Sequence, residues 1–174
     1  MPNELQQLQN KIAVLENELF THDHNGNQYR PVYTKNLFGT IPSRIHLHTA
    51  TIATTGNTDG YIIAPITGNL LSVDFSATDA LAASDTNYIT FTITNLGQGG
   101  AGTTAILAAT DANTTKATGG TAITANDKWA SGLTLNATPN NTQVVEGDRL
   151  RIRAAATGTL ANTVTFPAYC LRFV

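Results

Sequence analysis

Charged residues are scarce in this chain. Asp, Glu, Lys and Arg make up 13% of the 174 residues, which is about half the share usual in soluble domains. The formal net charge is −2, and the lysines and arginines form no single long patch. This pattern argues against a nucleic-acid partner and against an anionic membrane. Thr, Asn, Ala and Gly take the place of charges, which suits close packing against other subunits.

Cysteine is almost absent as well. Cys170 is the single cysteine, so no disulfide can form within the chain. It lies in the apolar run 166–174 (FPAYCLRFV), where only Arg172 is a basic neighbour. A reactive thiol needs a neighbour that lowers its pKa. We therefore expect Cys170 to be a small buried hydrophobe, and a chain of this length can build a core without disulfides.

Long apolar runs and catalytic motifs are missing too. No stretch approaches the length of a membrane span, and the polar start MPNELQQLQN does not resemble a signal peptide. We therefore expect synthesis in a cytoplasm and no membrane partner. The Gly-x-Ser-x-Gly, His-Glu-x-x-His and phosphate-loop motifs are absent. The glycine-rich segment 96–102 precedes no amphipathic helix that could hold a dinucleotide. The sequence predicts a protein that is not an enzyme.

Three regions differ in composition: 1–21, 22–43 and 44–174. The first contains much of the helix-forming material, the second is a polar connector, and the third is rich in Thr, Ala, Val, Ile and Gly. Within 1–21, apolar residues recur at the a and d positions of a heptad repeat. These residues are Leu5, Leu8, Ile12, Leu15 and Leu19. The pattern predicts a parallel coiled coil, although an amphipathic helix docked on its own body would show it too. Such a short helix is marginal alone, so we expect the body to oligomerise as well.

The connector begins with a His-x-His pair, His22 and His24. His22 follows Leu19 by three residues and takes the next d position. In an extended chain both imidazoles would share one face, and in a homotrimer six would surround the threefold axis. Six imidazole nitrogens suit an octahedral iron or nickel ion, whereas zinc usually prefers four ligands. The alternative is a solvated, hydrogen-bonded histidine pair that ends the helix.

The third region shows the period-of-two alternation typical of strands with one buried face. The predicted inward-facing residues of the three clearest runs are Leu71, Val73, Phe75 and Ala77, then Ile89, Phe91 and Ile93, then Leu150 and Ile152. Arg149, Arg151 and Arg153 alternate with the last pair and should form a polar strand face. Further candidate strands are 44–53, 61–66, 103–110, 133–137 and 163–174, with turns at segments such as 54–60 and 146–148. About eight strands without helices predict an all-β, jelly-roll-like β-sandwich.

The sandwich region contains two further candidate sites. His46 and His48 alternate with Ile45 and Leu47, which favours a polar strand face at a subunit boundary over a ligand site. A four-histidine site that combines them with the connector pair would require the connector to fold back. Trp129 is the single tryptophan and lies in a loop-like segment. It would serve as a binding platform if it were exposed.

Residues 16–39, ENELFTHDHNGNQYRPVYTKNLFG, resemble a pattern in structural proteins of tailed phages. In that pattern a short helix with apolar a and d residues leads into a His-x-His connector and then a β-domain. Leu15, Leu19, His22, His24 and Gly26 match it. The resemblance implies a trimeric virion protein that decorates the capsid or forms a fibre.

These observations lead to two hypotheses. The first is a capsid decoration or head-fibre subunit located in the virion, whose partners are its own copies and other capsid or tail proteins. The apolar face of 1–21 and the pair Leu37 and Phe38 would make its subunit contacts. The second is a receptor-binding tail-fibre tip, which needs an exposed aromatic residue such as Trp129. A hydrolase on the same fold would need paired carboxylates, and the acidic residues are scattered.

Overall fold

The computed structural model describes residues 43–129 and 132–174. This part of the chain forms eight strands and two short 3₁₀ helices. The strands are β1 (Ser43–His48), β2 (Gly56–Ile63), β3 (Gly68–Ser76), β4 (Tyr88–Asn95), β5 (Thr104–Ala105), β6 (Gln143–Val144), β7 (Arg149–Thr157) and β8 (Ala168–Phe173), and the helices are η1 (Asp111–Asn113) and η2 (Pro139–Thr142). Neither helix has the length and apolarity needed to span a membrane. The predicted coiled coil, the His22–His24 pair and residues 22–42 of the predicted connector lie outside the described residues, whereas Ser43, its last residue, begins β1.

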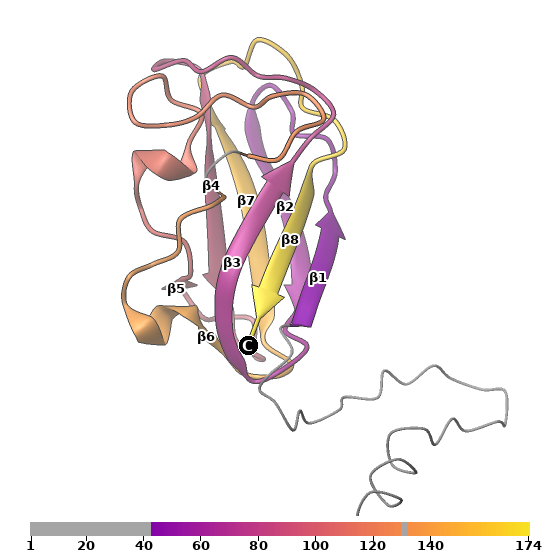
Figure 1. Ribbon diagram of the computed structural model, residues 1–174, viewed down its shortest axis with the longest axis vertical. Helices are drawn as coiled ribbons and strands as arrows, with labels where there is room; N and C mark the ends of the chain where they lie inside the picture. Colours follow the sequence, from indigo (N-terminus) through magenta and orange to yellow (C-terminus); the bar gives the residue numbers. More distant parts are fainter. Residues whose placement is uncertain (1–42, 130–131) are drawn as a thin grey trace, which may run out of the picture. The chain divides into compact units, whose positions relative to one another are not determined.

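The strands form two antiparallel sheets, which confirms the all-β sandwich. One sheet has the order β1-β8-β3-β6 and the other β2-β7-β4-β5, and Figure 1 shows them as two layers. The pairs β1 with β8, β2 with β7, β3 with β6 and β4 with β5 are nested, as in one long hairpin folded over on itself. The pairs β3 with β8 and β4 with β7 complete the two sheets. The first and last strands of the described sandwich, β1 and β8, are therefore neighbours although they are far apart in sequence.

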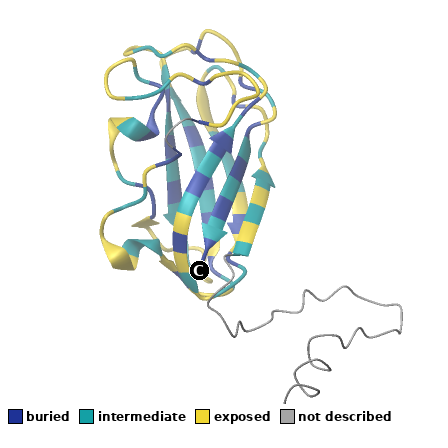
Figure 2. Ribbon diagram, viewed as in Figure 1, coloured by how far each residue is buried: buried dark blue, intermediate teal, exposed yellow. Residues whose placement is uncertain are grey.

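The core lies between the sheets, where alternate residues of β3, β4, β7 and β8 are buried (Figure 2). Its centre is an aromatic cluster formed by Phe75, Phe91, Trp129 and Tyr169. The ring centroids of Phe75 and Phe91 are 4.7 Å apart, and Trp129 packs edge-on against Phe91 at 5.1 Å. Tyr169 is so deeply buried that desolvation raises the pKa of its hydroxyl far above its usual range. Edge-on aromatic contacts of this kind join the two sheets.

Several predicted strands are confirmed. Ile89, Phe91 and Ile93 in β4 are fully buried, as are Leu150 and Ile152 in β7. The turn before β7 is also confirmed, because Gly147 has a φ of +90°. Glycine adopts this left-handed conformation without the steric cost of a Cβ atom.

Other predictions are wrong in part. Residues 54–60 were expected to form a turn, but β2 already begins at Gly56 because this segment pairs with β7. The ranges 103–110 and 133–137 contain only the two-residue strand β5 and isolated bridges such as Leu107 to Leu135. Trp129 is 4% exposed and so is a core residue, not a surface platform. Long-range strand pairing and packing decided these outcomes against the local turn, strand and loop signals.

The predicted inward-facing residues of β3 are also wrong at the first of them, Leu71. Leu70 is 2% exposed and Leu71 is 47% exposed, so Leu70 takes the core position expected for Leu71. The register explains the difference, because Leu70 pairs with Phe173 and Ser72 pairs with the adjacent Arg172. Leu71 is therefore the extra residue of a β-bulge, which shifts the alternation by one.

Candidate functional site

The candidate site is a pocket on the outer surface of the sheet β1-β8-β3-β6, beside the bulge in β3. It has a volume of about 470 Å³. Strands β3 and β8 form one side, and Lys128, Gly132, Leu133 and Leu135 form the other. The bulge turns Leu71 toward the surface at this point, and bulges commonly re-aim side chains in this way. The outer surface of β3 is therefore shaped locally by one inserted residue.

The segment opposite β3 is held close by backbone contacts. The amide of Trp129 donates to the carbonyl oxygen of Phe75 at 2.8 Å, and the amide of Leu133 donates to that of Val73 at 2.9 Å. Between them, Gly132 has a φ of +67°, and a Cβ atom there would lie 3.2 Å from the oxygen of Val73. Glycine therefore favours the close approach, because it adopts this φ without strain and adds no atom against the oxygen. The wall of the pocket is fixed to the same strand that carries the bulge.

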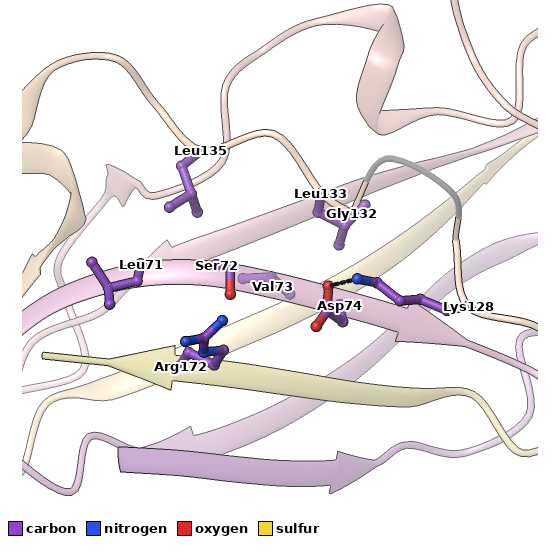
Figure 3. A pocket seen from close by; sticks show the side chains of 9 residues that line it. All are labelled: Leu71, Ser72, Val73, Asp74, Lys128, Gly132, Leu133, Leu135 and Arg172. Atoms are coloured by element: carbon purple, nitrogen blue, oxygen red, sulfur yellow. Dashed lines mark ion pairs between the residues drawn. The ribbon is translucent and has the colours of Figure 1, made fainter. Parts of the chain in front are cut away.

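The pocket combines an apolar side with a polar side. Leu71, Leu133 and Leu135 supply apolar surface, whereas Ser72, Asp74, Lys128 and Arg172 supply polar groups (Figure 3). Few well-placed polar groups among apolar side chains are typical of small-ligand sites.

Charge in the pocket is only partly balanced. Lys128 Nζ lies 2.8 Å from Asp74 Oδ1 and forms an ion pair. Among the residues that the structure describes, Arg172 forms no ion pair. Its Nε is buried without a hydrogen-bond partner, and so is the hydroxyl oxygen of Ser72. Buried polar atoms without partners are costly and uncommon, and neither atom has accessible surface through which a ligand could reach it.

A second group of side chains lies on the same sheet. Cys170 is half-buried and faces outward, so the prediction that it is a buried hydrophobe is wrong. Its Sγ lies 3.8 Å from Nε2 of His46. His46 and His48 are both exposed on β1, as expected for a polar strand face. Within 43–129 and 132–174, no three His, Cys, Asp or Glu side chains are arranged to hold a metal ion.

The outer surface of the other sheet is polar, as predicted from the three arginines. Arg153 donates two hydrogen bonds to Asp59, at 2.6 and 2.7 Å. These bonds hold the pKa of the Asp59 carboxyl below its usual range. The guanidinium of Arg149 stacks over the ring of Tyr61 at 4.3 Å. The contacts of Arg153 with Asp59 and of Arg149 with Tyr61 account for both arginines as structural residues.

The pocket was not predicted from the sequence. Arg172 was noted only as a neighbour of Cys170, and Ser72, Asp74 and Lys128 carried no motif. The sole local signal was the doublet Leu70 and Leu71, where two apolar residues interrupt the alternation. Comparisons of the chain with family models, with curated proteins and with solved structures found no match.

Proposed function

We propose that the chain is a non-enzymatic structural protein of a tailed-phage virion, with a jelly-roll body. The observation that carries this proposal is the nested strand pairing, β1 with β8 through β4 with β5. A long hairpin rolled into two four-stranded sheets is the arrangement of a jelly roll, and viral capsid proteins use that fold widely. Because folds host many functions, the proposal also depends on the N-terminal sequence pattern.

The proposed assembly is a parallel homotrimer. Its support is the uninterrupted heptad pattern from Leu5 to Leu19 and the low share of charged residues. Charged side chains are depleted where subunits meet. The proposed location is the capsid surface, as a decoration or head-fibre subunit that contacts other capsid or tail proteins.

The trimer is tested by light scattering of the purified chain and of two double variants. Ile12→Asp with Leu15→Asp places charge in the apolar seam and should dissociate the N-terminal bundle. Asn10→Asp with Asn17→Asp adds the same charge at outward heptad positions and should leave the trimer intact. A stable monomer or dimer for the unmodified chain would reject the assembly. Immunogold electron microscopy of purified virions tests the location, and absence from particles would reject the virion role.

We also propose an axial transition metal, iron, nickel or zinc, held by His22 and His24 of three chains. The support is that His22 continues the heptad register and that imidazole suits these ions. Metal analysis should find about one ion per three chains, lost in the His22→Ala, His24→Ala variant. The matched control is His46→Ala with His48→Ala, which should retain the metal. A metal-free trimer would leave a plain polar connector.

The second candidate is a receptor-binding tail-fibre tip. The burial of Trp129 removes the aromatic platform on which that hypothesis relied. The pocket beside the β3 bulge instead favours it, because a fibre tip must bind a ligand. Gold labelling at the fibre tips, together with inhibition of phage adsorption by the purified chain, would select this candidate over the capsid protein.

A further inference from the structure

The pocket beside the β3 bulge holds positive charge that its own residues do not neutralise. Arg44 on β1 lies directly opposite Arg172 on β8 in the strand register. Like charges at directly opposed positions destabilise a sheet. The one nearby carboxylate among the pocket-lining residues, Asp74, is already paired with Lys128. A negatively charged group next to the terminal nitrogens of Arg172 would therefore relieve this repulsion.

The chemistry of the pocket favours a carboxylate over a phosphate. The guanidinium of Arg172 is planar, and its fork matches the two oxygens of a carboxylate. Asp74 lies on the same rim, and it would repel a doubly charged phosphate more strongly than a singly charged carboxylate. The ion pair with Asp74 leaves Lys128 more than half exposed, so its ammonium can also approach the ligand.

The remaining space indicates that the carboxylate belongs to a sugar ring. A volume of about 470 Å³ is far larger than a carboxylate needs. Leu71, Leu133 and Leu135 provide an apolar surface for the C–H face of a ring (Figure 3). The carboxylate of Asp74 provides oxygen atoms that can accept hydrogen bonds from ring hydroxyls. Apolar contact on one face and hydroxyl contacts at the edge match a polyhydroxylated ring.

We propose that this pocket binds an acidic monosaccharide unit, of the uronic or sialic acid class, with its carboxylate on Arg172. Leu71 packs against the ring, and the carboxylate of Asp74 accepts hydrogen bonds from its hydroxyls. The bulge in β3 is the device that turns Leu71 toward the ring. This site is independent of the virion proposal, because it uses only residues of the described sandwich.

Saturation-transfer NMR and titration calorimetry on the full chain test the proposal. The probes are D-glucuronate and N-acetylneuraminate, with D-glucose, acetate and inorganic phosphate as comparisons. At least one acidic sugar should bind at least about tenfold more tightly than glucose or acetate, because only it offers both the charge and the ring. Phosphate should neither bind more tightly nor displace the sugar.

Binding measurements on variants distinguish a specific contact at this pocket from general attraction between charges. Arg172→Gln should weaken binding of the acidic sugar at least about tenfold, because it removes a charge-assisted contact. Leu71→Ala should weaken it about threefold, because it removes apolar contact with the ring. Arg149→Gln removes the same charge from the opposite sheet and should leave the affinity unchanged. Thermal melts establish that each variant is folded, and Leu71→Ala carries the test if Arg172→Gln does not fold.

Three results would overturn the proposal. One is the absence of binding by both acidic sugars at tens of millimolar. Another is equal affinity for acetate or phosphate, which would mark a general anion site. The third is an equal loss of affinity in Arg149→Gln and Arg172→Gln, which would place the binding elsewhere. None of these results bears on the trimer or on the capsid proposal, but each would remove the support that the pocket lends to the tail-fibre candidate.

Discussion

The two outer surfaces of the sandwich carry arginines in different states. On the sheet β2-β7-β4-β5, Arg153 is paired with Asp59 and Arg149 stacks on Tyr61. On the sheet β1-β8-β3-β6, Arg172 has no ion pair among the described residues and faces Arg44.

The regularity of strand pairing also differs between the two sheets. The pairing of β7 with β2 and β4 is continuous over eight residues on each side, whereas β3 is interrupted by a bulge beside Arg172. Arg151 on the regular surface also has a buried Nε without a partner, but its charge helps to lower the pKa of Asp59. The regular surface thus carries an arginine–carboxylate pair, whereas the arginine beside the bulge has no ion pair among the described residues. Departures from local rules concentrated at one place are typical of functional sites.

The largest expected effect tests the bulge itself. Leu70→Ala should lower the free energy of unfolding by about 2 to 5 kcal/mol, because Leu70 is buried in the core. Leu71→Ala, the adjacent control, should cost about 1 kcal/mol or less because Leu71 is half exposed. Urea denaturation followed by Trp129 fluorescence measures both. Equal losses would mean that the bulge is absent.

The next effect concerns the wall of the pocket. Gly132→Ala should cost about 1 to 2 kcal/mol, because alanine resists a φ of +67° and its Cβ would press on the carbonyl of Val73. Gly99→Ala is the control, since nothing lies within 4 Å of its added Cβ. The same denaturation measurement applies. A Gly132 variant as stable as the Gly99 variant would argue against a fixed wall.

A smaller effect should appear on the regular surface. Asp59→Asn should cost about 1 kcal/mol at neutral pH, because it breaks the paired hydrogen bonds from Arg153. The folded-state pKa of Asp59 lies below its ordinary value of 3.8, so the pair stabilises the fold above that pH. This contribution is lost as the pH falls through the lowered pKa.

Unfolding measured across the acid range should therefore show the gap between the unmodified chain and Asp59→Asn closing toward low pH. Glu146→Gln removes one carboxylate whose side chain has no hydrogen bond or ion pair among the described contacts. It should show no such gap at neutral pH. A gap that widened in acid would contradict the assigned direction of the Asp59 pKa shift.

The smallest effect compares the two arginine environments directly. Arg172→Gln should leave the free energy of unfolding unchanged or raise it by up to about 0.5 kcal/mol, because it removes repulsion from Arg44. Arg153→Gln should lower it by about 1 kcal/mol, because Asp59 loses its partner. Equal losses would show that Arg172 is paired, which would remove the contrast between the two surfaces.

Part of the fold was predictable because its signals are local. The inward-facing residues of β4 and β7 follow from strict alternation, and the turn at Gly147 follows from its flanking sequence. The pocket was not predictable, because it joins Ser72 and Asp74 on β3, Lys128 in a connecting segment and Arg172 on β8. No local pattern relates these positions, and the contacts between them depend on strand pairing across the whole domain.

By itself the sequence determined the all-β class and the polar arginine surface, since both depend on the period-of-two alternation of strands. Only the tertiary structure decided that Leu70, and not Leu71, enters the core. An inserted residue shifts the alternation, and either leucine fits the local pattern equally well. Only packing between the sheets decided that Trp129 is buried against Phe75 and Phe91, because the apolar surface available to a side chain depends on residues distant in sequence.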